Sequence, residues 1–159
     1  MILVMLGTQN NNFHRLLEEV DKLIDCNIIN EEVIAQIGYT KYESKNIKTI
    51  DFMSNEELEK LEKKANCIIT HGGVGSIISS IEKDKKVIAV PRLKQYGEHV
   101  NDHQIEIVKS FDELGYIIGI TDVSQLGEAL KKIDTFKPKK YMQNTGNIIK
   151  IVEDFIDNN

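Results

Sequence analysis

A glycine-rich segment, His71-Gly-Gly-Val-Gly-Ser76, follows a short apolar run and opens a stretch with helical spacing. Its three glycines let the backbone approach a ligand closely. Free N–H groups and the dipole at a helix N-terminus favour an anion such as a phosphate. The segment is neither a Walker A loop nor a GxGxxG fingerprint. Taken alone, it fits a phosphate-binding loop and a tight turn without a ligand equally well.

A second unusual segment runs from Pro91 to Gln104. It gathers many hydrogen-bonding side chains in one loop and helix start: Arg92, Lys94, Tyr96, Glu98, His99, Asn101, Asp102, His103 and Gln104. A polar surface loop with Asn101 or Asp102 as a helix N-cap is one interpretation. Because the segment accompanies a glycine-rich anion loop, we favour a binding role.

The sequence lacks the recognisable motifs of covalent or metal-dependent catalysis. Ser76 is not in a Gly-x-Ser-x-Gly elbow, and neither Cys26 nor Cys67 has a recognisable activating neighbour. There is no Asp-x-Asp, and the His and carboxylate spacing offers no convincing zinc set. The sequence therefore predicts no metal and no cofactor.

Two histidines are candidates for a general base, because imidazole titrates in the useful pH range. They are His71 and His99, which stand in the two segments described above. For each, hydrogen bonding that shapes its own loop is the alternative, and we favour that alternative.

Strand-like and helix-like segments alternate along the chain. Apolar runs predict strands at 2–6, 33–37, 47–52, 67–70, 87–90 and 115–118. Helical periodicity predicts helices at about 12–25, 54–64, 76–83, 98–111, 122–133 and 142–156, the second opened by a Ser54–Glu57 capping box. The strands do not alternate in polarity, so both faces of the sheet are expected to be covered.

This order predicts an α/β fold, a Rossmann-like doubly wound parallel sheet, in a single domain spanning residues 1–159. Right-handed crossovers place the strand-to-helix loops on one edge, where ligands bind. That edge would hold Gly7–Gln9, Phe52–Ser54, His71–Ser76 and Pro91–Gln104.

Composition excludes several other classes. Hydrophobic residues make up 41% and charged residues 28%, which argues against disorder. The net charge of -5 argues against a nucleic-acid surface. Two isolated cysteines indicate a reducing cytoplasm, and apolar runs are too short to span a bilayer. The lysines around 131–140 fit a solvated loop, or a weak attraction to an anionic membrane.

Three stretches together resemble a known family: Ile68–Ile77, Val87–Arg92 and Tyr96–Gln104. They are similar to the C-terminal domain of glycosyltransferase family 28. The likeness is greatest to short stand-alone versions, the catalytic subunits of two-component transferases of the dolichol pathway and of bacterial capsule and exopolysaccharide synthesis. It spans essentially the whole chain. The resemblance implies the donor-binding half of a GT-B glycosyltransferase, which binds a UDP-sugar.

The resemblance also implies roles for individual residues. Gly7, Thr8 and Gln9 would lie near the diphosphate, and the backbone of Phe52 and Met53 would read the uracil. The segment with His71, Gly72, Gly73, Gly75 and Ser76 would hold diphosphate and ribose, and the segment with Tyr96, Gly97, Glu98, Asn101, Asp102, His103 and Gln104 would face the donor sugar. One position departs from the family: Ser79 stands where fused murein-type members have a ribose-binding Glu, and Glu82 is one turn further on.

The implied function is a metal-independent, inverting transfer of a hexose from a UDP-sugar to a lipid-linked acceptor. A membrane-anchored, acceptor-binding partner would recruit this cytoplasmic chain to the inner face of the membrane. The alternative is a non-catalytic scaffolding subunit, which would not need the polar loop. A sugar-nucleotide epimerase of similar shape would need two domains, more than 159 residues hold. The last helix, with Ile148, Ile149, Ile151, Val152, Phe155 and Ile156, would pack on its own sheet or against the partner.

Overall fold

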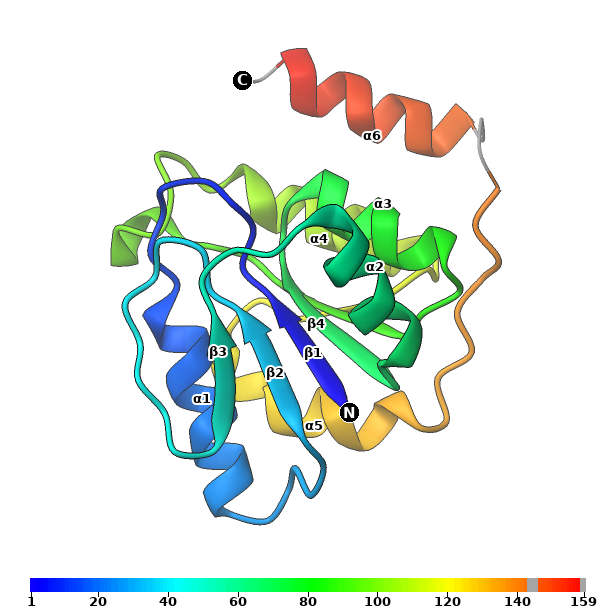
Figure 1. Cartoon of the computed structure of the whole chain (residues 1–159). Coiled ribbons are helices and arrows are strands. Elements are labelled where there is room, and N and C mark those ends of the chain that lie inside the picture. Colours follow the sequence, from blue (N-terminus) through cyan, green and yellow to red (C-terminus); the bar gives the residue numbers. More distant parts are fainter. Residues whose placement is uncertain (143–145, 158–159) are drawn as a thin grey trace.

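The computed structural model describes residues 1–142 and 146–157, apart from the side chains of 147 and 155–157. Its sheet contains β1 (Ile2–Met5), β2 (Val33–Gln36), β3 (Ile47–Ile50), β4 (Cys67–His71), β5 (Val87–Val90) and β6 (Ile118–Gly119). All strand pairs are parallel, in the order β3-β2-β1-β4-β5-β6. This is the doubly wound order, which reverses direction between β1 and β4 (Figure 1).

Helices cover both faces of the sheet. On one face, α1 (His14–Asp25) and α5 (Leu126–Ile133) pack on Ile2 and Val4 of β1. On the other, α2 (Asn55–Lys64), α3 (Val74–Glu82) and α4 (His103–Glu113) pack on Leu3 and Met5. Successive residues of β1 therefore enter two separate cores, which explains its unbroken apolar run.

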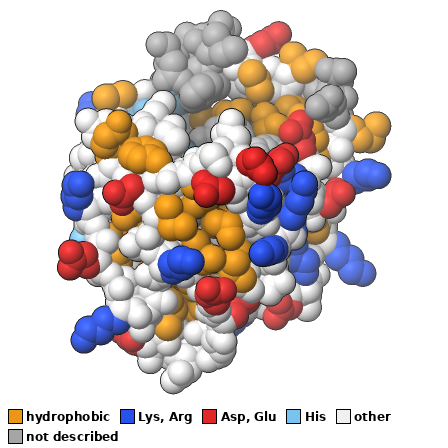
Figure 2. Space-filling view, viewed as in Figure 1, with side chains coloured by type: hydrophobic (Ala, Val, Ile, Leu, Met, Phe, Trp, Pro, Cys, Tyr) orange, Lys and Arg blue, Asp and Glu red, His pale blue; other side chains and the backbone are white. Residues whose placement is uncertain are grey.

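The face that carries α2 is only partly covered. Leu58 and Leu61 point toward the core as expected, yet both stay half-buried. Figure 2 shows hydrophobic side chains gathered in the middle of this face, with charged side chains around them. The predicted capping box is present, because Ser54 accepts from the backbone N–H of Glu57 and the Glu57 carboxylate accepts in return.

Several predicted boundaries were wrong for local reasons. The first helix begins at His14 and not at Asn12, because the Asn12 side chain accepts from the His14 N–H. The last strand is Ile118–Gly119 and not 115–118, because Gly115 has φ 81° and forms the turn after α4.

The glycine-rich helix begins at Val74, two residues earlier than predicted. The helix expected from Glu98 begins only at His103, since 94–96 form a short 3-10 helix that ends at Gly97 with φ 67°. These two shifts place the glycine loop directly at a helix start and leave 97–102 as an irregular loop.

The last helix, α6 (Gly146–Asp157), packs beside α4. Ile148 is buried in the core of the α2–α4 face, and Ile151 and Val152 lie half-buried against it. Ile149 remains exposed, and Met142 precedes the helix. The expected side chains of Phe155 and Ile156 lie outside the described residues. Figure 1 shows α6 beyond the α3–α4 layer, at the end of a long connection.

Candidate functional site

A cavity of about 690 Å³ lies at the carboxyl edge of β1 and β4, where the strand order reverses. Ligands bind at this point of doubly wound sheets, and the volume suits a small-molecule ligand. The cavity is lined by Gly7, Thr8, Gln9, Asn11, His71, Gly73, Val74, Gly75, Ser76, His99, Val100 and Gln104. A second cavity, of about 750 Å³, lies beside the outer strand β6, away from this point.

The N-terminus of α3 forms one wall of the cavity. Its N-cap is Gly73, which has no side chain to accept from the first backbone N–H groups. The first-turn residues Val74, Gly75 and Ser76 all line the cavity. Unsatisfied N–H groups and the helix dipole make this wall suited to an anion.

Two glycines make room for the ring of His71. A Cβ atom on Gly73 would lie 2.4 Å from His71 Nε2, and one on Gly7 would lie 2.8 Å from His71 Cε1. Gly7 also has φ 76°, a conformation that disfavours other residues. The imidazole therefore holds the two glycine loops at a fixed separation.

His71 is neutral at physiological pH. Burial, followed by the positive charge of Arg92, lowers its pKa to about 3, against an opposing hydrogen bond with the Met5 carbonyl. His71 Nδ1 lies 3.4 Å from that carbonyl oxygen. An imidazole that resists protonation is a weak general base, so this environment favours the loop-shaping role.

The protonation of His71 gives a prediction about pH. We expect its imidazole to stay neutral from pH 8 to pH 5, as measured by NMR titration of the histidine ring protons, with His71→Asn to assign the signal. Because its folded pKa lies below the unfolded value of about 6.5, acid protonates the unfolded chain first. The contribution of His71 to stability is therefore complete above about pH 6.5 and falls by up to about 1.4 kcal/mol per pH unit below it. A His71 midpoint between pH 6 and 7 would contradict this assignment.

His99 also lines the cavity, from the loop before α4. Its Nδ1 accepts a 3.4 Å hydrogen bond from the Asn101 N–H. Partial burial lowers its pKa, and the charge of Arg92 adds to the effect. Of the two candidate bases, His99 is the less buried.

Gln104 connects the two segments that the sequence singled out. Its Oε1 accepts from the N–H of Gly72 at 3.1 Å and from the N–H of Arg92 at 3.0 Å. The residue is only 5% exposed, yet it lines the cavity. Because Oε1 serves the backbone, the Nε2 amide is the part left for a ligand.

The role of Gln104 can be tested with two variants. Gln104→Ala leaves two buried N–H groups without an acceptor and is expected to cost about 2–4 kcal/mol of unfolding free energy. Gln104→Glu keeps an acceptor oxygen but buries a carboxylate, so it is expected to cost less than Gln104→Ala without being neutral. Urea unfolding measures both. Equal losses in the two variants would show that the acceptor oxygen is not what matters.

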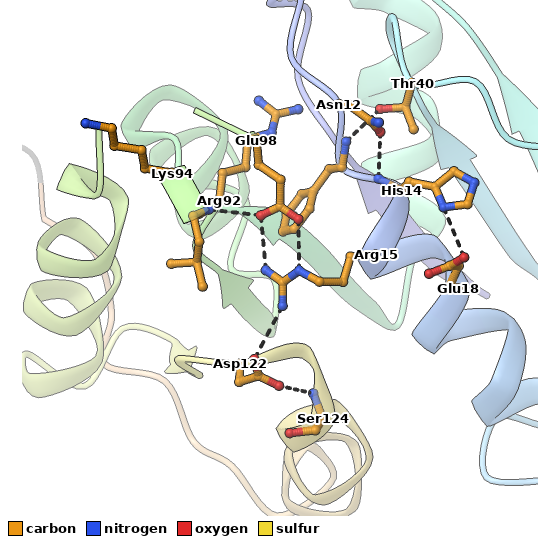
Figure 3. A network of polar contacts seen from close by, with 12 residues as sticks. Asn12, His14, Arg15, Glu18, Thr40, Arg92, Lys94, Glu98, Asp122 and Ser124 are labelled. Atoms are coloured by element: carbon orange, nitrogen blue, oxygen red, sulfur yellow. Dashed lines mark hydrogen bonds and ion pairs between the residues drawn. The ribbon is translucent and has the colours of Figure 1, made fainter. Parts of the chain in front are cut away.

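Glu98, predicted to contact a donor sugar, is not among the residues that line the cavity. It is 3% exposed and accepts from Arg15 Nε at 2.9 Å and from Arg15 Nη2 at 3.0 Å. Its Oε2 also accepts from the N–H of Leu93 at 2.9 Å. Arg15 further contacts Asp122 at 3.4 Å (Figure 3). It also stacks on Tyr96, with its guanidinium carbon 4.2 Å from the ring centre. Both carboxylate oxygens are thus used to hold the loop.

Other polar residues of this loop also bind their own backbone. Asp102 accepts from the N–H of Lys94 at 2.8 Å, and Asn101 accepts from the N–H of His103 at 3.1 Å. Among the described residues, nothing bonds to the buried Nδ1 of His103. These contacts explain the unusual composition of the segment as loop-shaping, with His99 and Gln104 reaching the cavity.

Phe52, which by resemblance would read the uracil, and Ser79, which stands at the position of the family's ribose-binding Glu, lie outside the cavity lining. Phe52 follows β3 at the same edge of the sheet and packs edge-on against Tyr39, with ring centres 5.1 Å apart. The Ser79 hydroxyl donates to the buried Glu62 at 3.3 Å and accepts from Lys83 at 2.8 Å. Ser79 is therefore occupied on the α2 side of its helix.

The structure brings together part of the predicted site. Around the cavity lie Gly7, Thr8, Gln9, His71, Gly73, Gly75, Ser76, His99 and Gln104. Outside its lining lie Phe52, Met53, Gly72, Tyr96, Gly97, Glu98, Asn101, Asp102 and His103. The sequence did not single out the lining residues Asn11, Val74 and Val100. It also did not predict that Arg92 is buried or that Arg15 bonds to Glu98 and Asp122. In the part of the chain that the structure describes, no three His, Cys, Asp or Glu side chains are placed to hold a metal, and no helix has the length and apolarity to cross a membrane.

The doubly wound parallel sheet, with its glycine-rich helix start at the switch point, is a Rossmann-like fold of the kind found in GT-B glycosyltransferases. The family model described as the glycosyltransferase family 28 C-terminal domain matches residues 1–158. The chain belongs to this family, so both the predicted fold class and the predicted family are confirmed.

Individual relatives are more distant. The UDP-N-acetylglucosamine transferase subunit ALG13 of Candida glabrata is 26% identical over 108 residues, covering 67% of this chain and 51% of that protein. This chain thus spans about half the length of that relative. The UDP-GlcNAc 2-epimerase of Methanocaldococcus jannaschii, solved with UDP-GlcNAc and UDP, is 20% identical with a TM-score of 0.61, covering 98% of this chain and 45% of that one. The solution structure of ALG13 is 18% identical with a TM-score of 0.54, covering 95% of this chain and 93% of that one. These structural likenesses show the fold.

Proposed function

We propose that this chain is the catalytic, donor-binding subunit of a UDP-sugar-dependent glycosyltransferase that transfers a hexose to a lipid-linked acceptor. The observation that carries the proposal is the open N-terminus of α3 at the switch-point cavity, between two glycine loops. Family membership and the name of the Candida glabrata relative, a UDP-N-acetylglucosamine transferase subunit, support a UDP-sugar as the ligand.

The reaction would be an inverting displacement without a metal. The acceptor hydroxyl attacks the anomeric carbon, the bond from that carbon to the diphosphate oxygen breaks, and UDP leaves with the electron pair. The first-turn N–H groups and the dipole of α3 would stabilise the charge on the leaving diphosphate. The proton of the acceptor hydroxyl would go to a base on the partner subunit or to His99, which lines the cavity.

The partner would be a membrane-anchored, acceptor-binding subunit that recruits this chain to the inner face of the membrane for polysaccharide or glycan synthesis. A surface available for it is α6, which packs beside α4 and leaves Ile149 exposed. Removing the residues after Lys140 and testing co-purification with the product of an adjacent gene would probe this contact. Loss of co-purification with retained folding supports the proposal, and unchanged co-purification contradicts it.

A nucleotide panel tests the proposed function. We expect UDP and UDP-GlcNAc to shift backbone NMR signals of residues around the α3 N-terminus, because these N–H groups face the cavity. ADP, which offers the same diphosphate with another base, is expected to bind at least about tenfold more weakly, a difference of about 1.4 kcal/mol. Equal binding of UDP and ADP would contradict a UDP-sugar site, and a scaffolding subunit would bind neither.

A further inference from the structure

Arg92 is a buried cation with unused hydrogen-bonding capacity. Its side chain is 1% exposed, and its Nη2 donates to the backbone carbonyls of Leu6 and Asn11. Among the described residues, nothing accepts from its buried Nε or Nη1. Buried charged groups are normally paired and fully hydrogen-bonded, so a buried guanidinium with two unused nitrogens is unusual.

The charge of Arg92 is balanced only in part. The nearby Glu98 carboxylate is bonded to Arg15 and to the Leu93 N–H, and the ion pairs found among the described residues do not include Arg92. Burial lowers the pKa of Arg92 to about 10, so the guanidinium remains protonated at neutral pH. An uncompensated positive charge thus persists inside the domain.

That charge lies directly behind the wall of the cavity. Leu6 immediately precedes Gly7, and Asn11 itself lines the cavity, so the guanidinium holds both ends of this loop. The backbone N–H of Arg92 is bonded to Gln104, another lining residue. The positive charge also lowers the pKa of His71 and of His99, and both rings line the cavity. The electrostatic field of Arg92 therefore reaches the cavity from behind.

We propose that Arg92 is the fixed positive charge that stabilises the donor diphosphate, acting through the loop Leu6–Asn11 and not by contact. This inference rests on the proposed function, because it assumes a diphosphate in the cavity. A guanidinium stays charged at physiological pH and its position is fixed by packing, so no reorganisation is needed when charge develops on the leaving group. Together with the α3 N-terminus, it gives the cavity two sources of positive potential from different elements.

Comparing UDP with uridine isolates the charge, because uridine lacks the diphosphate. Arg92→Met removes the charge and keeps much of the side-chain volume. We expect it to raise the Kd for UDP at least about tenfold and to change the Kd for uridine by less than about threefold. NMR titration measures both ligands, and circular dichroism with urea unfolding checks the fold. The UDP affinity of the wild-type chain should also fall more steeply with salt than that of the variant.

Arg92→Lys keeps the positive charge but replaces the planar guanidinium with an ammonium group. The ratio of the uridine Kd to the UDP Kd is expected to stay within about threefold of the wild-type ratio. This variant also carries the test if Arg92→Met does not fold, because a collapse of the ratio in Arg92→Lys would overturn the proposal. An equal loss of affinity for UDP and for uridine in Arg92→Met would assign Arg92 a structural role only. A wild-type chain that binds neither ligand would instead refute the proposed function.

Discussion

Replacing Ser76 with aspartate is expected to abolish UDP binding, with a rise in Kd of about 100-fold or more, while the domain stays folded. Ser76 belongs to the first turn of α3 and lines the cavity. A carboxylate at this position would occupy the anion site with the protein's own charge and repel a diphosphate. The same charge favours the helix N-terminus, so stability is expected to stay constant or rise by up to about 1 kcal/mol. Isothermal calorimetry and urea unfolding measure the two effects separately.

A matched control places the same charge change on another helix. Asn55→Asp adds a carboxylate to the first turn of α2, at an exposed position outside the cavity. Its Kd for UDP is expected to stay within about twofold of the wild-type value, because exposed charges at a distance are screened by salt. If Ser76→Asp binds UDP as tightly as this control, the diphosphate does not lie at the α3 N-terminus.

Replacing Arg15 with methionine is expected to cost about 3–5 kcal/mol of unfolding free energy. The loss arises because Glu98 is nearly inaccessible and would keep a buried charge without its partner. The double variant Arg15→Met with Glu98→Gln removes that charge and is expected to regain part of the loss. Urea unfolding of the wild type, both single variants and the double variant gives the coupling energy directly.

An exposed ion pair provides the comparison for Arg15. Lys60→Met breaks the 2.9 Å contact with Glu56 on the surface of α2 and is expected to change stability by less than about 1 kcal/mol. If Arg15→Met lowers the unfolding free energy as little as Lys60→Met does, the Arg15–Glu98 ion pair does not hold the 91–102 loop in place. Another contact must then fix the position of that loop.

Local signals in the sequence predicted most of the fold. The apolar run of β1 requires burial on both faces. The Ser54–Glu57 capping box fixes the start of α2, because Ser54 is the N-cap of that helix. The glycines around His71 predict that the backbone approaches a ligand closely, and the structure shows that part of the space they leave holds the His71 ring itself. Such features depend on neighbours in the chain, so a single sequence contains them.

The rest of the site depends on contacts between distant positions. Glu98 and Arg15 are 83 positions apart, and nothing near Arg15 on its amphipathic helix marks it as a partner. Without that contact, the sequence predicts that Glu98 faces a ligand and begins a helix; the helix begins instead at His103, and the Glu98 carboxylate is bonded to Arg15. Arg92 likewise reads as a polar loop residue, because burial of its guanidinium under Leu6 and Asn11 arises only when the β1 and β5 loops meet.

Calorimetric titration of the purified chain with UDP, once in EDTA and once in magnesium, measures whether the chain binds a nucleoside diphosphate without a metal. We expect binding with a Kd in the micromolar to millimolar range, which corresponds to about 4–8 kcal/mol. We also expect the same Kd, within about twofold, in EDTA and in magnesium, because the α3 N-terminus and Arg92 supply the positive potential. Absence of heat at millimolar UDP, or binding that appears only with magnesium, would contradict it.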